Sequence, residues 1–172
     1  MINPRLLRRR IKSVQSTAKI TRAMEMIATA KMKKAQDAAL AGRPYAEKIG
    51  QVIRDLTASQ TFDQEEIPTL LQKRDVKRIG IVHITSDRGL CGGLNSGMNR
   101  QFAGFALRSD NPVSAVAVGR KGSNFLARSG VDMSAEFSGL GDRPTMMDVL
   151  PIARVVMENY ASGYFDMGYL SH

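Results

Sequence analysis

The sequence predicts an α/β protein built in two parts, on three observations. Helical spacing of apolar residues runs through the first 56 residues. Short apolar runs then alternate with helical segments from residue 76 onward, which is typical of a parallel sheet with helices on both faces. Glycine-rich turns follow several of these runs. We therefore expect a long helix (1–57), a linker (58–75), and a three-layer α/β/α domain with a mostly parallel, Rossmann-like sheet (76–172).

The long helix is predicted by its start and by its spacing. Asn3 is a favourable N-cap, and Pro4 suits the first helical position. Apolar or small side chains recur three and four residues apart, at Leu7, Ile11, Val14 and Ala18, then on a shifted face at Ile20, Met24 and Ile27, and onward to Leu56. A helix of this extent is roughly 75–80 Å long, and Pro44 is expected to kink it. The narrow stripe, rich in alanine and methionine, favours contact with another helix; a solvated surface helix is the alternative.

The remaining elements follow in order along the chain. Residues 57–75 are polar and indicate a linker with one short helical turn. We expect strands at 79–84, 113–118, 131–137 and 165–170, and helices at 94–107, 123–128 and 146–161. A doubly wound sheet does not normally end on a strand without a covering helix, so we expect a chain that is shortened at its carboxyl end.

The positive charge is confined to the first third of the chain. Residues 1–60 carry 13 lysines and arginines against 4 aspartates and glutamates, and this net +9 equals the formal charge of the whole chain. The excess predicts an acidic partner, such as nucleic acid, an anionic membrane or an acidic protein surface. No apolar run is long enough to span a bilayer, so we expect no direct membrane insertion. The single cysteine excludes an internal disulfide and fits a reducing compartment.

The most informative segment is the turn 86–95, Ser-Asp-Arg-Gly-Leu-Cys-Gly-Gly-Leu-Asn. It joins a predicted strand to a predicted helix, but it matches neither G-x-G-x-x-G nor G-x-x-x-x-G-K-[ST]. We expect Asp87 and Arg88 to form an ion pair or to cap the following helix. The three glycines are expected to allow a tight turn and close packing. Phosphate binding here, or at the glycine-containing turn 119–122, is the alternative.

Catalytic and metal-binding patterns are scarce. Two histidines and one cysteine are too few for a zinc site. His83 lies inside a predicted strand, where we expect a packed core histidine. Cys91 lacks a G-x-C-x-G frame and a neighbouring base, so we expect a small buried thiol. We therefore expect no catalytic residue, no metal and no cofactor.

Three separate segments resemble the gamma subunit of F-type ATP synthase. Residues 11–14, 19–26, 31–32 and 43–47 are similar to that family's N-terminal helix, residues 85–95 to its most distinctive internal motif, and residues 139–142 also fit. The likeness covers essentially the whole chain in the right order. The motif positions that we expect to be structurally important are Asp87, Arg88, Gly89, Cys91, Gly92, Gly93 and Asn95.

The resemblance implies a mechanical part, not an enzyme. In the family, the N-terminal helix pairs antiparallel with a C-terminal helix, and this coiled coil enters the bore of the alpha/beta hexamer, where the beta subunits carry out catalysis. The α/β domain forms a foot near the epsilon subunit and the membrane rotor (c) ring. By resemblance, the chain is the N-terminal portion of this rotor shaft without its C-terminal helix. We expect it on the cytoplasmic face of a bacterial inner membrane, as a peripheral protein, with the mitochondrial matrix side as the alternative. The residues expected to meet the hexamer are Arg8, Arg9, Arg10, Lys19, Arg22 and Met24.

Two functions of other classes stay open on the residues alone. One is a small α/β enzyme or nucleotide-binding domain that uses the turn 87–95. The other is a basic-helix nucleic-acid binder, although the basic residues interleave with the apolar stripe, whereas a basic zipper keeps the two apart. A shortened chain of this kind is expected to self-associate, because the stripe and one side of the sheet would be exposed.

Overall fold

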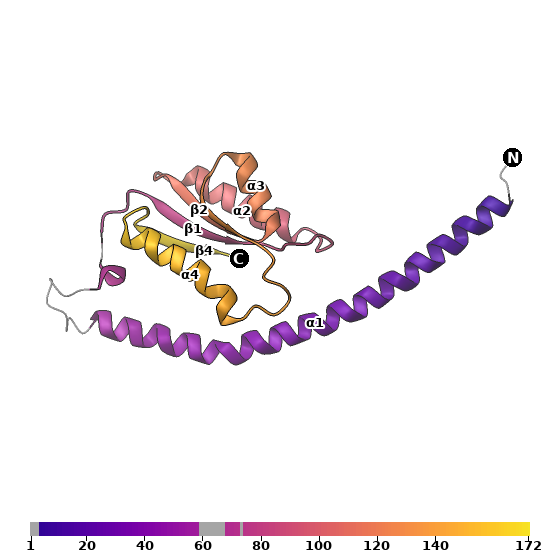
Figure 1. Cartoon of the computed structure of the whole chain (residues 1–172), viewed down its shortest axis with the longest axis horizontal. Coiled ribbons are helices and arrows are strands. Elements are labelled where there is room, and N and C mark those ends of the chain that lie inside the picture. The colour runs from indigo at the N-terminus through magenta and orange to yellow at the C-terminus, as the bar shows by residue number, and fades with distance from the viewer. Residues whose placement is uncertain (1–3, 59–67, 73) are drawn as a thin grey trace. The chain divides into compact units, whose positions relative to one another are not determined.

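The computed structural model describes residues 4–58, 68–72 and 74–172, in two units, Met1–Thr61 and Phe62–His172. The first unit is the helix α1, which spans Pro4–Ala58, 55 residues or about 80 Å. Figure 1 shows it as one continuous, curved helix, and Pro44 lies inside its span. The predicted long helix is thus confirmed, while Asn3, its predicted N-cap, lies outside the described residues.

The second unit contains a four-stranded, wholly parallel sheet in the order β3-β2-β1-β4 (Figure 1). Its strands are β1 (Ile79–Ile84), β2 (Val113–Val118), β3 (Asp132–Phe137) and β4 (Met167–Ser171). Its helices are α2 (Leu94–Arg108), α3 (Arg120–Ser129) and α4 (Met146–Ala161), and a single 3-10 turn (Thr69–Leu71) precedes β1. The chain leaves β1 for β2 and β3 on one side and returns through α4 to β4 on the other.

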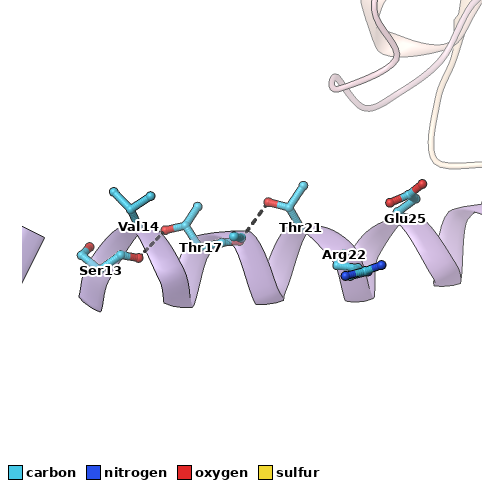
Figure 2. Close-up of a pocket in the computed structure, with 7 residues that line it drawn as sticks. Ser13, Val14, Thr17, Thr21, Arg22 and Glu25 are labelled. Carbon is cyan, nitrogen blue, oxygen red and sulfur yellow. Dashed lines mark hydrogen bonds between the residues drawn. The ribbon is translucent and has the colours of Figure 1, made fainter. Parts of the chain in front are cut away.

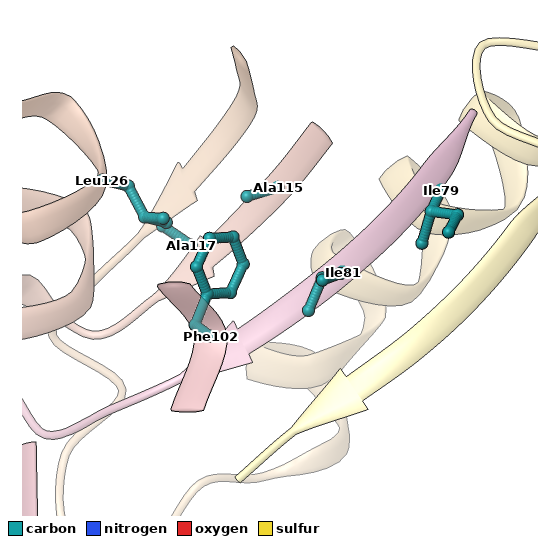
Figure 3. Packing of buried hydrophobic residues seen from close by; sticks show 6 residues of the cluster. All are labelled: Ile79, Ile81, Phe102, Ala115, Ala117 and Leu126. Atoms are coloured by element: carbon teal, nitrogen blue, oxygen red, sulfur yellow. The ribbon is translucent and has the colours of Figure 1, made fainter. Parts of the chain in front are cut away.

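The core lies on both faces of the sheet, because residues of β2 alternate between them. Ala115 and Ala117 face Phe102 of α2 and Leu126 of α3, and Figure 3 shows these side chains beside Ile79 and Ile81 of β1. On the other face, Val116 and Val118 of β2 pack with Ile152 of α4. The expected three-layer α/β/α arrangement is therefore present.

Two boundaries within the α/β domain differ from the prediction by more than one residue. Helix α3 begins at Arg120 and not at residue 123, so Gly122 lies inside the helix. Strand β4 begins at Met167, because Phe165 is buried ahead of it with its ring against the backbone of Gly80. A Cβ atom at Gly80 would lie 2.5 Å from that ring, so the glycine makes room for it.

Candidate functional site

The first candidate surface is the whole circumference of α1, where no residue is buried. All of the basic residues predicted to meet a partner are exposed, and so is Met24, at 51% of its full surface. Large apolar side chains are exposed beside them, among them Val14 at 68% and Ile20 at 59%. A soluble helix with this much apolar surface requires a covering partner. The predicted exposure of the stripe is confirmed.

The exposed residues of α1 include a heptad seam of mostly apolar or small residues, with Thr21 and Glu25 as its polar members, which simple three-and-four spacing did not reveal. One set of positions recurs every seven residues: Leu7, Val14, Thr21, Ala28, Ala35, Gly42, Ile49 and Leu56. A second set follows four residues later: Ile11, Ala18, Glu25, Met32, Ala39, Ala46 and Ile53. Such a repeat is typical of a left-handed coiled coil. The basic residues named above all lie off this seam, and Met24 flanks it.

The centre of the seam is rich in small residues, such as Ala28, Ala35 and Ala39, which allow a partner helix to approach closely, and it also contains Glu25 and Met32. Two hydroxyl groups, one beside the seam and one in it, form bonds within the helix: Thr17 Oγ1 donates to the Ser13 carbonyl and Thr21 Oγ1 to the Thr17 carbonyl, each at 3.0 Å. Figure 2 shows Val14, Thr17 and Thr21 along one side of α1, with both hydroxyl bonds directed back into the helix. Thr17 and Thr21 therefore direct their hydroxyl hydrogens into the helix, which leaves their methyl groups for a partner.

The second candidate surface is the turn after β1, where Asp87 does not act as expected. Its Oδ1 accepts a hydrogen bond from the Arg120 amide at 2.9 Å, and its Oδ2 accepts one from the Gly139 amide at 2.8 Å. These two donors, Arg120 first, hold the pKa of Asp87 below its usual value. No ion pair joins Asp87 to Arg88 among the described residues, and α2 has Gly93 at its N-cap with no side-chain bond. The predicted ion pair and helix cap are thus wrong.

Thr85, Ser86 and Asp87 together form what we call the clamp. The Thr85 hydroxyl accepts from the Gly122 amide at 2.7 Å, and the Ser86 carbonyl accepts from the Lys121 amide at 3.1 Å. With the bond from Arg120 to Asp87, the clamp satisfies the first three amides of α3. A helix otherwise leaves such amides free to bind an anion. The anion-binding alternative for the turn 119–122 is therefore disfavoured by the structure.

The glycines that permit close packing are not those of the 86–95 turn. A Cβ atom at Gly89 would meet nothing within 4 Å, and one at Gly93 only the Ser96 hydroxyl at 3.7 Å. Gly92 does have a left-handed φ of 59°, as a tight turn requires. Close packing occurs instead at Gly119, where a Cβ would lie 2.1 Å from the Thr85 carbonyl oxygen.

The rest of the turn is held by Asn95 and presents Leu90. Asn95 Oδ1 accepts from the Ser86 amide at 3.1 Å, and its amide group donates to Cys91 Sγ at 3.0 Å. Cys91 is only partly buried, contrary to the expectation of a buried thiol. Leu90 is 95% exposed and adopts a left-handed φ of 63°.

His83 is a fully buried core residue, as predicted. Its Nε2 faces Asn99 Oδ1 at 2.9 Å and its Nδ1 faces Ser171 Oγ at 3.2 Å, while its ring lies 4.9 Å from that of Phe102. Because the Asn99 oxygen can only accept, Nε2 carries the proton and Nδ1 accepts from the serine. Burial lowers the pKa of His83, against a smaller opposing effect of Asn99. The neutral ring therefore fastens β4 to β1.

Residues 4–58, 68–72 and 74–172 contain no group of three or more His, Cys, Asp or Glu placed to hold a metal ion. Over the same residues, no helix is both long and apolar enough to cross a membrane.

Comparison with known proteins first identifies the general class of protein that the chain resembles. A family model described as ATP synthase matches residues 3–172. The fold also matches a chain of the Tetrahymena thermophila mitochondrial ATP synthase central stalk and c-ring structure, with a TM-score of 0.67 and 29% identity over 83% of this chain and 61% of that one. A rotor chain of the Euglena gracilis mitochondrial enzyme shares the fold, with a TM-score of 0.54 at 16% identity, over 96% of this chain and 55% of that one.

The curated relatives identify the particular subunit that the chain resembles. An ATP synthase gamma chain of Dehalococcoides mccartyi is 52% identical over all of this chain and 60% of the relative. A gamma chain of Herpetosiphon aurantiacus is 42% identical over 96% of this chain and 58% of the relative. The chain thus belongs to the ATP synthase gamma-chain family, and it spans about 60% of the length of these relatives.

Proposed function

We propose that this chain is the N-terminal portion of the central rotor shaft of an F-type ATP synthase. In this role it transmits torque between the ion-driven rotor ring and the alpha/beta catalytic hexamer, and it has no active site of its own. The observation that carries the proposal is α1, a 55-residue helix without a buried residue that has a heptad seam and a basic surface. Membership of the ATP synthase gamma-chain family supports the assignment of this helix to a rotor shaft.

The seam of α1 calls for a second helix along its length. We assign that helix to the part of the full-length relatives that this chain does not span, about 40% of their length, and we propose that it runs antiparallel to α1. The small residues at the centre of the seam, such as Ala28 and Ala35, let the two backbones approach closely. Larger residues at both ends, such as Leu7 and Leu56, would bury apolar surface on pairing.

The charged faces of α1 are proposed to meet acidic loops of the hexamer through Arg8, Arg9, Arg10, Lys19 and Arg22, with Met24 as an apolar contact beside them. Exposed ion pairs contribute only about 0–1 kcal/mol each. A basic rod held by many weak pairs can therefore exchange partners as it turns. Long-range attraction would keep it centred without locking it at one angle.

The α/β domain is proposed as the foot that meets the epsilon subunit and the membrane rotor (c) ring. The solved neighbour from Tetrahymena thermophila, described as central stalk and c-ring, supports this general placement. We place the chain on the membrane periphery, at the cytoplasmic face of a bacterial inner membrane, in line with its bacterial relatives.

The proposal is tested by co-expression with alpha and beta subunits and purification through a tag on beta. We expect the chain to co-purify and to change ATPase activity relative to the hexamer alone. If the chain alone does not co-purify, it is fused to the remaining C-terminal part of the Dehalococcoides mccartyi relative. If the fusion also fails to assemble with the alpha and beta subunits, the assignment as a rotor shaft is refuted.

A matched pair of variants in the fusion tests the seam. Ala35 lies in the seam, whereas Ala30 lies on nearly the opposite side of α1. Both are exposed alanines, so Ala35→Arg and Ala30→Arg make the same chemical change. We expect Ala35→Arg to abolish pairing and Ala30→Arg to retain it, as judged by the helical content and thermal unfolding of the purified fusion. Equal behaviour of the two variants would contradict the heptad register.

A further inference from the structure

We propose that the Asp87 carboxylate is a built-in anion that holds the carboxyl edge of the sheet together and fixes the turn 88–93. Parallel α/β sheets commonly bind phosphate or carboxylate groups at this edge, where helix amino termini present free amides. In this chain, a side chain of the protein itself lies against those amides. The inference concerns the α/β domain alone and holds whether or not the shaft proposal is correct.

The first support is the reach of the carboxylate across three chain segments. Asp87 follows β1, its donor Arg120 begins α3 after β2, and its donor Gly139 follows β3. The two donors are 33 and 52 residues away along the chain. A neighbouring bond, from the Gly119 amide to the Phe137 carbonyl at 2.7 Å, joins the ends of β2 and β3. One carboxylate thus ties together the carboxyl ends of three adjacent strands.

The second support is that the interaction uses the negative charge. A carboxylate that accepts from backbone amides forms charge-assisted bonds, which are about twice as strong as neutral ones. The positive end of the α3 dipole and the side chains of Arg88 and Arg120 favour the charged form as well. A neutral acceptor of the same size would gain much less from these charges.

The consequence for the turn is geometric. The turn 88–93 begins after Asp87 and ends where α2 begins, close to Asn95. The hydrogen bonds of Asp87 and Asn95 therefore fix both ends of the turn. Leu90 stands between these points, exposed and in a left-handed conformation that is unfavourable for a residue with a Cβ atom. Release of Asp87 should therefore loosen this turn as well as the edge of the sheet.

The test is amide hydrogen exchange, measured by NMR on the 172-residue chain and on an Asp87→Ala variant. The control is Asp110→Ala, which removes an exposed carboxylate from the loop between α2 and β2. We expect the Arg120 and Gly139 amides to exchange about tenfold faster or more in Asp87→Ala, and at wild-type rates in the control. Sodium formate should slow both amides again in a saturable way, whereas sodium chloride of equal ionic strength should not.

Two results would overturn the proposal. One is exchange at wild-type rates in Asp87→Ala, because the carboxylate would then not hold the edge. The other is faster exchange on which formate and chloride act alike, because no seat for an anion would then exist. If the alanine variant does not fold, Asp87→Asn retains the shape and removes both the charge and one of the two acceptor oxygens. Faster exchange at both amides in that variant supports the proposal, and unchanged rates refute it.

Discussion

Among the described glycines that lie within helices, Gly122 has the least room for a side chain, and this predicts the outcome of its substitution by alanine. Gly122 lies within α3, and a Cβ atom there would stand 2.8 Å from His83 Cδ2 and from the Thr85 side chain. Gly97, within α2, has no atom within 4 Å of the same position. Both glycines are in helices and neither has a left-handed φ, so alanine brings the same gain in helix propensity to each, about 0.5–1 kcal/mol.

The difference between the two substitutions comes from packing. At Gly122 the added methyl group overpacks the core, which costs about 1–3 kcal/mol. It also displaces the Thr85 hydroxyl from the Gly122 amide, a loss of about 1 kcal/mol. We therefore expect Gly122→Ala to lower the free energy of unfolding by about 1–3 kcal/mol and Gly97→Ala to raise it by up to about 1 kcal/mol.

The assay is urea unfolding followed by tyrosine fluorescence, because three of the four tyrosines lie in the α/β domain. The midpoint should fall for Gly122→Ala and rise slightly for Gly97→Ala, with similar slopes. If Gly122→Ala is as stable as the wild type, Thr85 and His83 can move aside freely. The close approach of α3 to β1 would then not constrain the sequence.

Three further outcomes are expected. The pKa of His83 is lower in the folded chain than in the unfolded chain, so the unfolded chain binds more protons at acidic pH. The free energy of unfolding should therefore fall as the pH drops below about 6.5. A free energy of unfolding by urea that stays constant between pH 7 and 5.5 would contradict this. Leu126→Ala, at a side chain with 0% exposure, should cost about 2–5 kcal/mol in thermal unfolding, and a loss under about 1 kcal/mol would show that the site collapses. The double variant Lys19→Gln and Arg22→Gln should weaken association with the alpha/beta hexamer at low salt but not at high salt, and a difference that persists at high salt would exclude screened charge as the cause.

Local patterns were enough to predict most of the elements. The run Val113–Val118 is apolar almost throughout, and β2 occupies those six residues with five of them buried. The helix predicted at 146–161 is α4, and the side chains of Thr145 and Asp148 form a capping box at its start. Such signals lie within one segment and need no knowledge of the tertiary fold.

The roles that sequence reasoning missed depend on distant partners. Asp87 has an arginine next to it in sequence, yet its carboxylate binds amides 33 and 52 residues away. Phe165 looked like part of a strand, but the absence of a side chain at Gly80 lets its ring lie there instead. The heptad seam was present in the sequence all along, and a count at intervals of seven would have found it. The assignment of the basic residues of α1 to the hexamer stays a prediction.

The heptad seam of α1 has a consequence for the outline of the proposed shaft. An α-helix completes slightly less than two turns in seven residues, so a seven-residue repeat drifts by about 20° at each step. Between Leu7 and Leu56 the repeat takes seven steps, and the drift adds up to about 140°. A companion helix that follows it begins near one side of α1 and finishes close to the other. The cross-section of the two-helix pair is therefore oriented differently at each position along the shaft axis. Protein that surrounds the shaft at one such position would contact a different side of the pair as the shaft rotates.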